Sequence, residues 1–99
     1  MKVFITRKIP DRGVNVLKAK GYEVVVSPHD RVLKKEELMA ELVKSKYDAV
    51  LCLLTDKIDA EVLGVAGKQC KIFANYAVGF DNIDVKAAEE RRIMVTNTP

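Results

Sequence analysis

Short apolar runs alternate with amphipathic stretches along the whole 99-residue sequence. Five runs rich in β-branched and other apolar residues predict strands, at 2–6, 22–27, 48–54, 70–76 and 93–97. The four stretches between these runs carry helical periodicity or capping residues. Strands that alternate with helices at this spacing form a parallel sheet with right-handed crossovers. The alternation therefore restricts residues 1–99 to a single α/β domain.

A five-stranded parallel sheet most often has the strand order 2-1-3-4-5. We predict that order in a flavodoxin-like three-layer fold, with helices on both faces of the sheet. The runs DAVLCLL (48–54) and IMVTN (93–97) show the continuous hydrophobicity that is typical of strands covered on both faces.

Local signals place the ends and the buried faces of the helices. Gly21 is a natural stop for the first helix, and Asp84 is a candidate N-cap for the last one. The second helix is the clearest, because Leu38, Leu42 and Val43 fall on one face and lysines and glutamates on the other.

Composition and charge exclude several classes of function. The net charge is +3, but the basic and acidic residues are interleaved, so we expect no nucleic-acid partner. No apolar run approaches the roughly 18 residues that a membrane helix needs, and we expect no membrane partner. The N-terminal apolar run is too short for the core of a signal peptide, which indicates a cytoplasmic protein.

The residue types that most often carry chemistry or bind metals are sparse. Cys52 and Cys70 lie in or beside apolar runs without metal-ligand spacing, so we interpret them as buried free thiols. His29 lies in an SPHD loop with no nucleophile and carboxylate partner in view. We predict no metal ligands and no catalytic residues in this chain.

The most informative loop follows the fourth predicted strand. In sheets of this kind, ligands bind beyond the carboxyl ends of the strands. Gly79 lies in that loop, where glycine allows positive φ or close approach of a ligand to the backbone. The Val78 and Gly79 amides could hold a carboxylate there, but a simple turn explains the glycine equally well. Two asparagines, Asn75 and Asn82, flank the loop, and Asn97 is at the end of the fifth strand.

Several common sites are absent from the sequence. The turn after the first strand has no GxGxxG pattern, and GVAGKQ lacks the spacing of a phosphate-binding loop. An anion could instead use the basic residues after the first and third strands, which are Arg7, Lys8 and Lys57. The residues by themselves therefore indicate an α/β domain with a possible anion-binding loop.

Three segments give a family likeness: KVFITRKIP, LLTDKID and NYAVGFDNIDVKAAEERRIMVTNTP. Together they resemble the N-terminal part of the D-isomer-specific 2-hydroxyacid dehydrogenases, most closely the glyoxylate/hydroxypyruvate reductase branch. The likeness covers the whole chain. It implies that residues 1–99 correspond to the N-terminal part of the substrate-binding (catalytic) domain of an NAD(P)-dependent oxidoreductase.

The resemblance also implies roles for particular residues. The loop amides of Val78 and Gly79 would bind the substrate carboxylate, and Leu54 would line the same pocket. Asp81 and Asn82 would set the loop. The NTP end would be the point where the family's chain crosses to its cofactor domain.

The family's nucleotide-binding domain, which binds NAD or NADP and carries the catalytic groups, has no counterpart here. We therefore expect a fragment, excised or engineered, that binds small 2-oxo or 2-hydroxy acids weakly and has no activity or cofactor site alone. Without the family's returning helix, apolar side chains of the sheet would be exposed, and we expect a homodimer. The alternative is a free-standing, engineered or self-associating flavodoxin-like module with no ligand.

Overall fold

The structure, a computed structural model, describes residues 1–97. Its elements are β1 (Lys2–Ile5), α1 (Asp11–Ala19), β2 (Glu23–Val26), α2 (Lys35–Lys44), β3 (Ala49–Cys52), α3 (Ala60–Val65), β4 (Ile72–Asn75), α4 (Val85–Glu90) and β5 (Met94–Asn97). All nine predicted elements are confirmed, with bounds a few residues shorter. Two residues of the NTP end, at positions 98 and 99, lie outside the described part of the chain.

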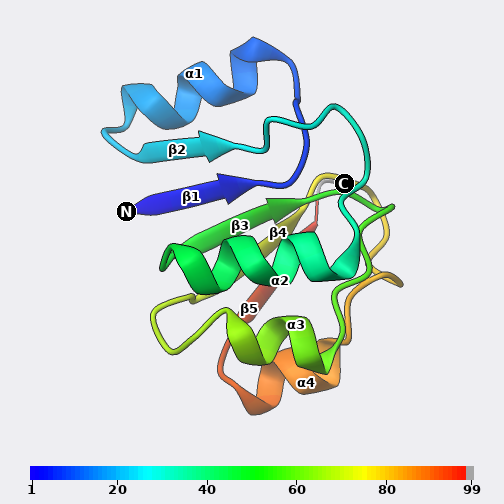
Figure 1. The fold of residues 1–99 in the computed structure, drawn as a ribbon. Coiled ribbons are helices and arrows are strands. Elements are labelled where there is room, and N and C mark those ends of the chain that lie inside the picture. Colours follow the sequence, from blue (N-terminus) through cyan, green and yellow to red (C-terminus); the bar gives the residue numbers. More distant parts are fainter. Residues whose placement is uncertain (98–99) are drawn as a thin grey trace.

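The five strands form one sheet in the order β2-β1-β3-β4-β5, and every pairing is parallel (Figure 1). This is the predicted strand order. Because all strands run the same way, their carboxyl ends share one edge of the sheet, and the loops after them gather there.

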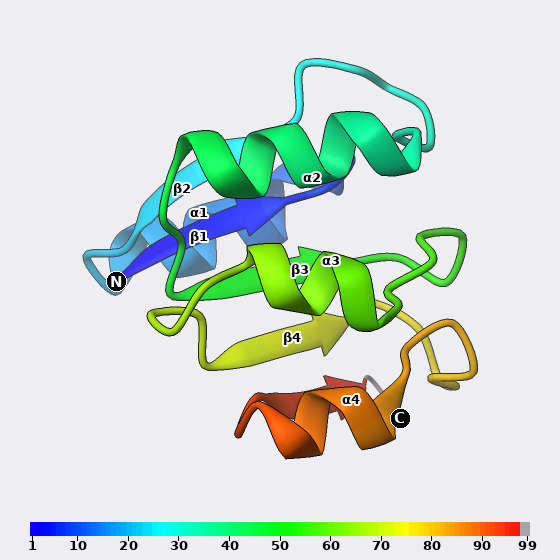
Figure 2. The ribbon, with the colours of Figure 1, turned by 60° about the horizontal axis from the view of Figure 1, so that its bottom comes forward.

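Helices cover the two faces unequally. Figure 2 shows α2, α3 and α4 in front of the sheet and α1 behind it. Right-handed crossovers produce this division, because the chain moves one way across the sheet from β1 to β2 and the other way in the three later connections. The fold is therefore a three-layer α/β sandwich, as predicted.

The two layers of side chains give two apolar clusters. The larger cluster lies under α2, α3 and α4 and includes Phe4, Val50 and Phe73 from the strands. The smaller cluster lies under α1 and includes Val3 and Ile5. Successive residues of a strand alternate between the clusters, as the pleat of a strand requires.

Most of the local signals are confirmed. Gly21 ends α1 with φ of 85°, and the Asp84 side chain accepts a hydrogen bond from the Ala87 N–H at the start of α4. The prediction for Val43 is wrong, because its side chain is 63% exposed. Val43 directly follows the buried Leu42 and is rotated from it by about 100° around the helix axis, which turns it off the buried face.

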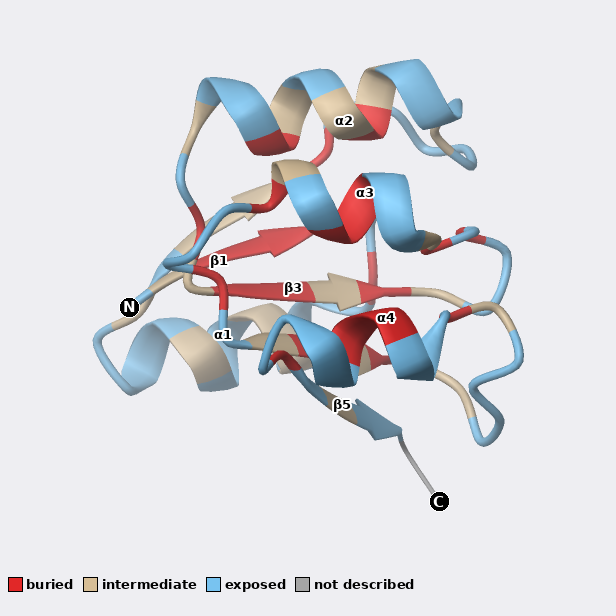
Figure 3. Ribbon diagram, turned by 90° about the horizontal axis from the view of Figure 1, so that it is seen from below, coloured by how far each residue is buried: buried red, intermediate tan, exposed pale blue. Residues whose placement is uncertain are grey.

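Strand β5 is covered on one face only. Met94 is 60% exposed and Thr96 is exposed, whereas Val95 packs against the larger cluster. Figure 3 shows β5 in the colours of exposed and intermediate residues. β3 is covered on both faces, whereas one face of β5 is open within residues 1–97, which agrees with the expectation that apolar side chains of the sheet are exposed in this chain. The reason is geometric, since α1 lies over β1 and β2 and the other three helices lie on the opposite face.

Candidate functional site at the carboxyl edge of the sheet

The loops after β3 and β4 lie side by side at the carboxyl edge of the sheet (Figure 2). A parallel bridge between Ile58 and Ile83 joins them. In this bridge the Ile58 N–H donates to the Asn82 carbonyl and the Asp84 N–H donates to the Ile58 carbonyl, both at 2.8 Å. The two loops therefore form one unit outside the sheet.

Two asparagine side chains hold this unit together from inside. Asn75, at the end of β4, is 1% exposed, and its Nδ2 donates to Oδ1 of Asn82 at 2.8 Å. Nδ2 of Asn82 donates to Oδ1 of Asn75 at 3.2 Å and to the carbonyls of Leu53 and Asp56 at 3.1 and 2.8 Å. We call this pair of side chains the amide network. It connects the end of β4 to the loops on both sides.

A buried carboxylate braces the same region from the side of β1. Asp56 is 4% exposed. Its Oδ2 accepts hydrogen bonds from the Thr6 hydroxyl at 2.5 Å and from the Leu53 N–H at 2.9 Å. Thr6 follows β1, so this contact ties the first strand to the loop after the third.

The residues assigned to the substrate site lie on these loops, but in different places. Leu54 is 54% exposed and lines a hollow of about 410 Å³ with Thr55 and Lys57. Val78 is 73% exposed at the tip of the next loop, and neither Val78 nor Gly79 lines that hollow.

The charges of that hollow do not favour an anion. Its wall carries the carboxylates of Asp59, Asp81 and Asp84 against the single ammonium of Lys57. The hollow is therefore a poor site for a negatively charged ligand.

Of the two predicted reasons for a glycine at position 79, positive φ is wrong. Gly79 does not have positive φ, unlike Gly21 and Gly67. A Cβ added to Gly79 would meet no atom within 4 Å. The backbone conformation therefore does not require glycine, which leaves close approach of a ligand as the predicted reason still open.

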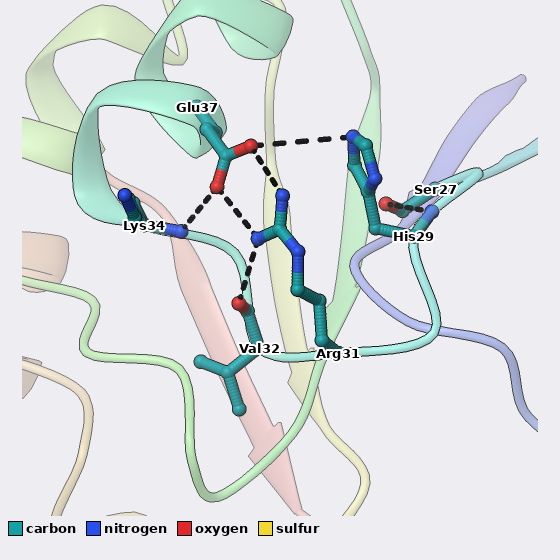
Figure 4. A network of polar contacts seen from close by, with 6 residues as sticks. All are labelled: Ser27, His29, Arg31, Val32, Lys34 and Glu37. Atoms are coloured by element: carbon teal, nitrogen blue, oxygen red, sulfur yellow. Dashed lines mark hydrogen bonds and ion pairs between the residues drawn. The ribbon is translucent and has the colours of Figure 1, made fainter.

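The other half of the edge is held by charged groups on the surface. Arg31, in the loop after β2, makes two hydrogen bonds of 2.8 Å to the carboxylate of Glu37. The Lys34 N–H donates to the same carboxylate at 2.9 Å, and Nε2 of His29 lies 4.0 Å from it (Figure 4). We call the side chains of His29, Arg31 and Glu37 the charged cluster. The hydrogen bonds from Arg31 and from the Lys34 N–H lower the pKa of Glu37 to about 2.

Other candidate groups have structural explanations. Arg7 pairs with Asp30 at 3.4 Å on the surface. Cys52 and Cys70 are buried free thiols, as predicted, and burial raises their pKa to about 12 and about 11.

The described part of the chain has neither a candidate metal site nor a candidate membrane-spanning helix. No group of three or more His, Cys, Asp and Glu side chains there is arranged to hold a metal ion. No helix within residues 1–97 is long and apolar enough to cross a membrane.

The turn after β1 does not fit a dinucleotide site of the Rossmann type. Such a site needs glycines in the turn after the first strand, so that backbone amides can approach the pyrophosphate. Here that turn contains Arg7, Lys8 and Ile9, and the Thr6 hydroxyl is already bonded to Asp56. These residues therefore do not fit the pyrophosphate of a nicotinamide cofactor.

The fold and its loops define a parallel α/β domain that would bind ligands at the carboxyl edge. The family model of the D-isomer specific 2-hydroxyacid dehydrogenase catalytic domain matches residues 3–99. The chain belongs to the D-isomer specific 2-hydroxyacid dehydrogenase family.

Individual relatives agree with this assignment. The chain is 47% identical over 98 residues to a glyoxylate reductase of Thermococcus kodakarensis and 49% identical to one of Pyrococcus furiosus, covering 99% of this chain and 28% of each relative. The structure of the TT0316 protein from Thermus thermophilus matches with a TM-score of 0.89 and 38% identity, over 100% of this chain and 30% of that one. A D-isomer specific 2-hydroxyacid dehydrogenase from Polaromonas, described as putative, matches with a TM-score of 0.90 and 26% identity, over 99% of this chain and 30% of that one. The chain thus matches the catalytic domain and spans 28% of the length of these curated relatives.

Sequence reasoning missed the bracing role of Asp56 and Thr6. The two residues are 50 positions apart, and no motif connects them. The available signal was weak: Thr6 and Asn75 are polar residues at the ends of strands whose other residues are mostly buried and apolar.

Proposed function

We propose that the chain is the substrate-binding part of an NAD(P)-dependent 2-hydroxyacid dehydrogenase that acts on glyoxylate or a similar small 2-oxo acid. In this proposal the loop after β4 binds the substrate carboxylate through the backbone amides of Val78 and Gly79. Leu54 provides an apolar contact on the neighbouring loop. The nicotinamide cofactor belongs to a part of the protein outside these residues.

The proposal rests on the hydrogen bonding of the N–H groups in the loop after β4. Among residues 1–97, no group accepts a hydrogen bond from the N–H of Val78, Gly79 or Phe80. These residues are also exposed, and no side chain lies where a Cβ on Gly79 would be. Free amides on an exposed loop can bind a carboxylate without a charged side chain. The identity to glyoxylate reductases supports the choice of ligand.

The expected affinity of the chain alone is weak. Two amide hydrogen bonds to a carboxylate contribute about 1.5–3 kcal/mol each before the cost of association. We therefore expect a Kd of about 1 mM or weaker, which corresponds to roughly 4 kcal/mol. We also expect no oxidation of NADH or NADPH by the isolated chain in the presence of glyoxylate, because a hydride donor site is missing from these residues.

Titration with sodium glyoxylate tests the proposal by NMR on the ¹⁵N-labelled chain. We expect saturable shifts of amide signals in the loop after β4, with sodium chloride at equal ionic strength as the control. If the amide signals of that loop showed no saturable shift, the result would favour the alternative, a module without a ligand.

We also propose that the chain forms a homodimer and works in the cytoplasm. The edge formed by β5 and α4 supports association, because Met94 is 60% and Val85 39% exposed beside a hollow of about 430 Å³. Sedimentation over a roughly hundredfold range of concentration tests the dimer. A monomer mass that stays constant across that range would contradict it, and Met94→Lys should weaken a real dimer.

A further inference from the structure

The loop after β4 has two successive carbonyl groups that asparagine side chains occupy. Nδ2 of Asn97 donates to the Val78 carbonyl. Nδ2 of Asn75 donates to the Gly79 carbonyl at 2.8 Å. The two asparagines come from the ends of neighbouring strands, where they are partners in the register of β4 and β5. The loop backbone is therefore anchored to the sheet at two consecutive peptide groups.

Because the peptide group is planar, a fixed carbonyl also fixes the direction of the N–H group that follows it. The structure contains no cis peptide bond in the described residues, and in a trans peptide the C=O and the following N–H point in opposite directions. The Gly79 N–H is therefore directed away from Asn97, and the Phe80 N–H away from Asn75. The Val78 N–H has no such constraint, because no donor among residues 1–97 binds the Ala77 carbonyl.

Asn75 can hold its carbonyl partner only in one orientation. Its Oδ1 faces donors, the Nδ2 of Asn82 at 3.2 Å and the Sγ of Cys52 at 3.5 Å. Its Nδ2 faces acceptors, the Gly79 carbonyl and Oδ1 of Asn82. Reversing the amide would place oxygen against oxygen at 2.8 Å. The amide network thus fixes which atom of Asn75 meets the loop.

We infer that Asn75 and Asn97 are positioning residues that turn the N–H groups of Gly79 and Phe80 outward to hold an anionic carboxylate. The inference rests on the proposed function and refines it, because it assigns the main contacts to Gly79 and Phe80. The carboxylate of Asp81, the next residue, opposes an anion and keeps the binding weak. If the asparagines only stabilised the loop, replacing either one would affect the Gly79 and Phe80 N–H groups alike.

The test uses the glyoxylate titration on two neutral variants of the whole chain. Asn97→Ala removes the partner of the Val78 carbonyl, and we expect it to reduce the glyoxylate-induced shift at Gly79 more than at Phe80. Asn75→Leu removes the partner of the Gly79 carbonyl, and we expect the larger loss at Phe80. Each variant should bind glyoxylate about fivefold more weakly, the effect of one net hydrogen bond.

Thr96→Ala is the matched control. Thr96 is exposed in the same strand as Asn97 and has no role in the amide network, so we expect both shifts to remain. Asn75 lies in the interior, so Asn75→Leu can fail to fold. Asn97 is exposed, and Asn97→Ala alone still tests whether the shift at Gly79 falls more than the shift at Phe80.

The outcomes separate the inference from the proposed function. A loop response that both asparagine variants retain, or one confined to Val78, would overturn the inference and leave the proposed function standing. A wild-type chain without any saturable shift would contradict both. The expected split, Gly79 lost with Asn97 and Phe80 lost with Asn75, supports both.

Discussion

The loops after β3 and β4 and the loop after β2 lie on the same edge of one sheet, but different chemistry holds them. The amide network between Asn75 and Asn82 is neutral and largely shielded from water. The charged cluster around Arg31 and Glu37 is solvated, with side chains that are 47% and 32% exposed. A buried polar group that loses its partner pays the cost of desolvation, whereas an exposed ion pair is replaced by water. The comparison predicts that a hydrogen bond in the amide network contributes more to the free energy of unfolding than a hydrogen bond in the charged cluster.

The largest effect is expected from Asn82→Ala. The substitution removes both hydrogen bonds between the side chains of Asn82 and Asn75 and the bonds from Nδ2 of Asn82 to the carbonyls of Leu53 and Asp56. We expect the free energy of unfolding to fall by about 3 kcal/mol, in the range for breaking a buried hydrogen-bond network. Urea unfolding followed by circular dichroism measures it.

Asn15→Ala is the control for that experiment. Asn15 is exposed on α1, where alanine has the higher helix propensity, so we expect no loss of stability. If Asn82→Ala were as mild as this control, the amide network would not be the main support of the two loops.

A smaller effect is expected from Thr6→Val. Valine has nearly the same shape as threonine, but it cannot donate to Oδ2 of Asp56. The carboxylate keeps its bond to the Leu53 N–H at 2.9 Å, so we expect a loss of about 1–2 kcal/mol. The same unfolding assay, with Thr96→Val on the exposed strand as control, measures it. Equal stability of the two variants would show that the brace between β1 and the loop after β3 is dispensable.

The charged cluster should contribute less and should depend on pH. Hydrogen bonds from Arg31 and from the Lys34 N–H lower the pKa of Glu37 from 4.5 to about 2. A carboxyl group whose folded pKa is lowered stabilises the fold above its unfolded pKa, and this contribution is lost as the pH falls through the folded pKa. Glu37→Gln should therefore lower the urea midpoint slightly at neutral pH, and the difference should vanish as the pH falls from about 4.5 to about 2.

Arg31→Ala provides the check on that explanation. It should reproduce the small effect of Glu37→Gln at neutral pH, and added salt should reduce both effects. An effect as large as that of Asn82→Ala would contradict the contrast between the two halves of the edge.

These networks also mark how far the sequence could be interpreted. Hydrophobic alternation was enough for the element order and the parallel sheet. The Asp84 cap was visible because it acts within a few residues of itself. The pairing of Thr6 with Asp56 was not visible. It depends on the register between β1 and β3 and on the shape of a loop, neither of which is encoded in a local pattern.

The candidate site was predictable to a similar extent. The resemblance assigned Leu54, Val78 and Gly79 to one site, and the structure places all three on loops of the carboxyl edge. Sequence reasoning could note the asparagines around the loop but not their partners. Which carbonyl each asparagine amide meets follows from three-dimensional packing, which no local pattern encodes.

The smallest effect on stability is expected at the residue that first drew attention to the loop. Gly79 has no positive φ, and an added Cβ would meet no atom within 4 Å. We therefore expect Gly79→Ala to change the free energy of unfolding by no more than about 0.5 kcal/mol, as for an ordinary surface substitution. If the glycine serves close approach of a carboxylate, the same variant should weaken the glyoxylate response of the loop, because the new methyl group covers the N–H groups beside it. A variant that is fully stable and binds glyoxylate like the wild type would show that neither the fold nor the ligand requires glycine at position 79.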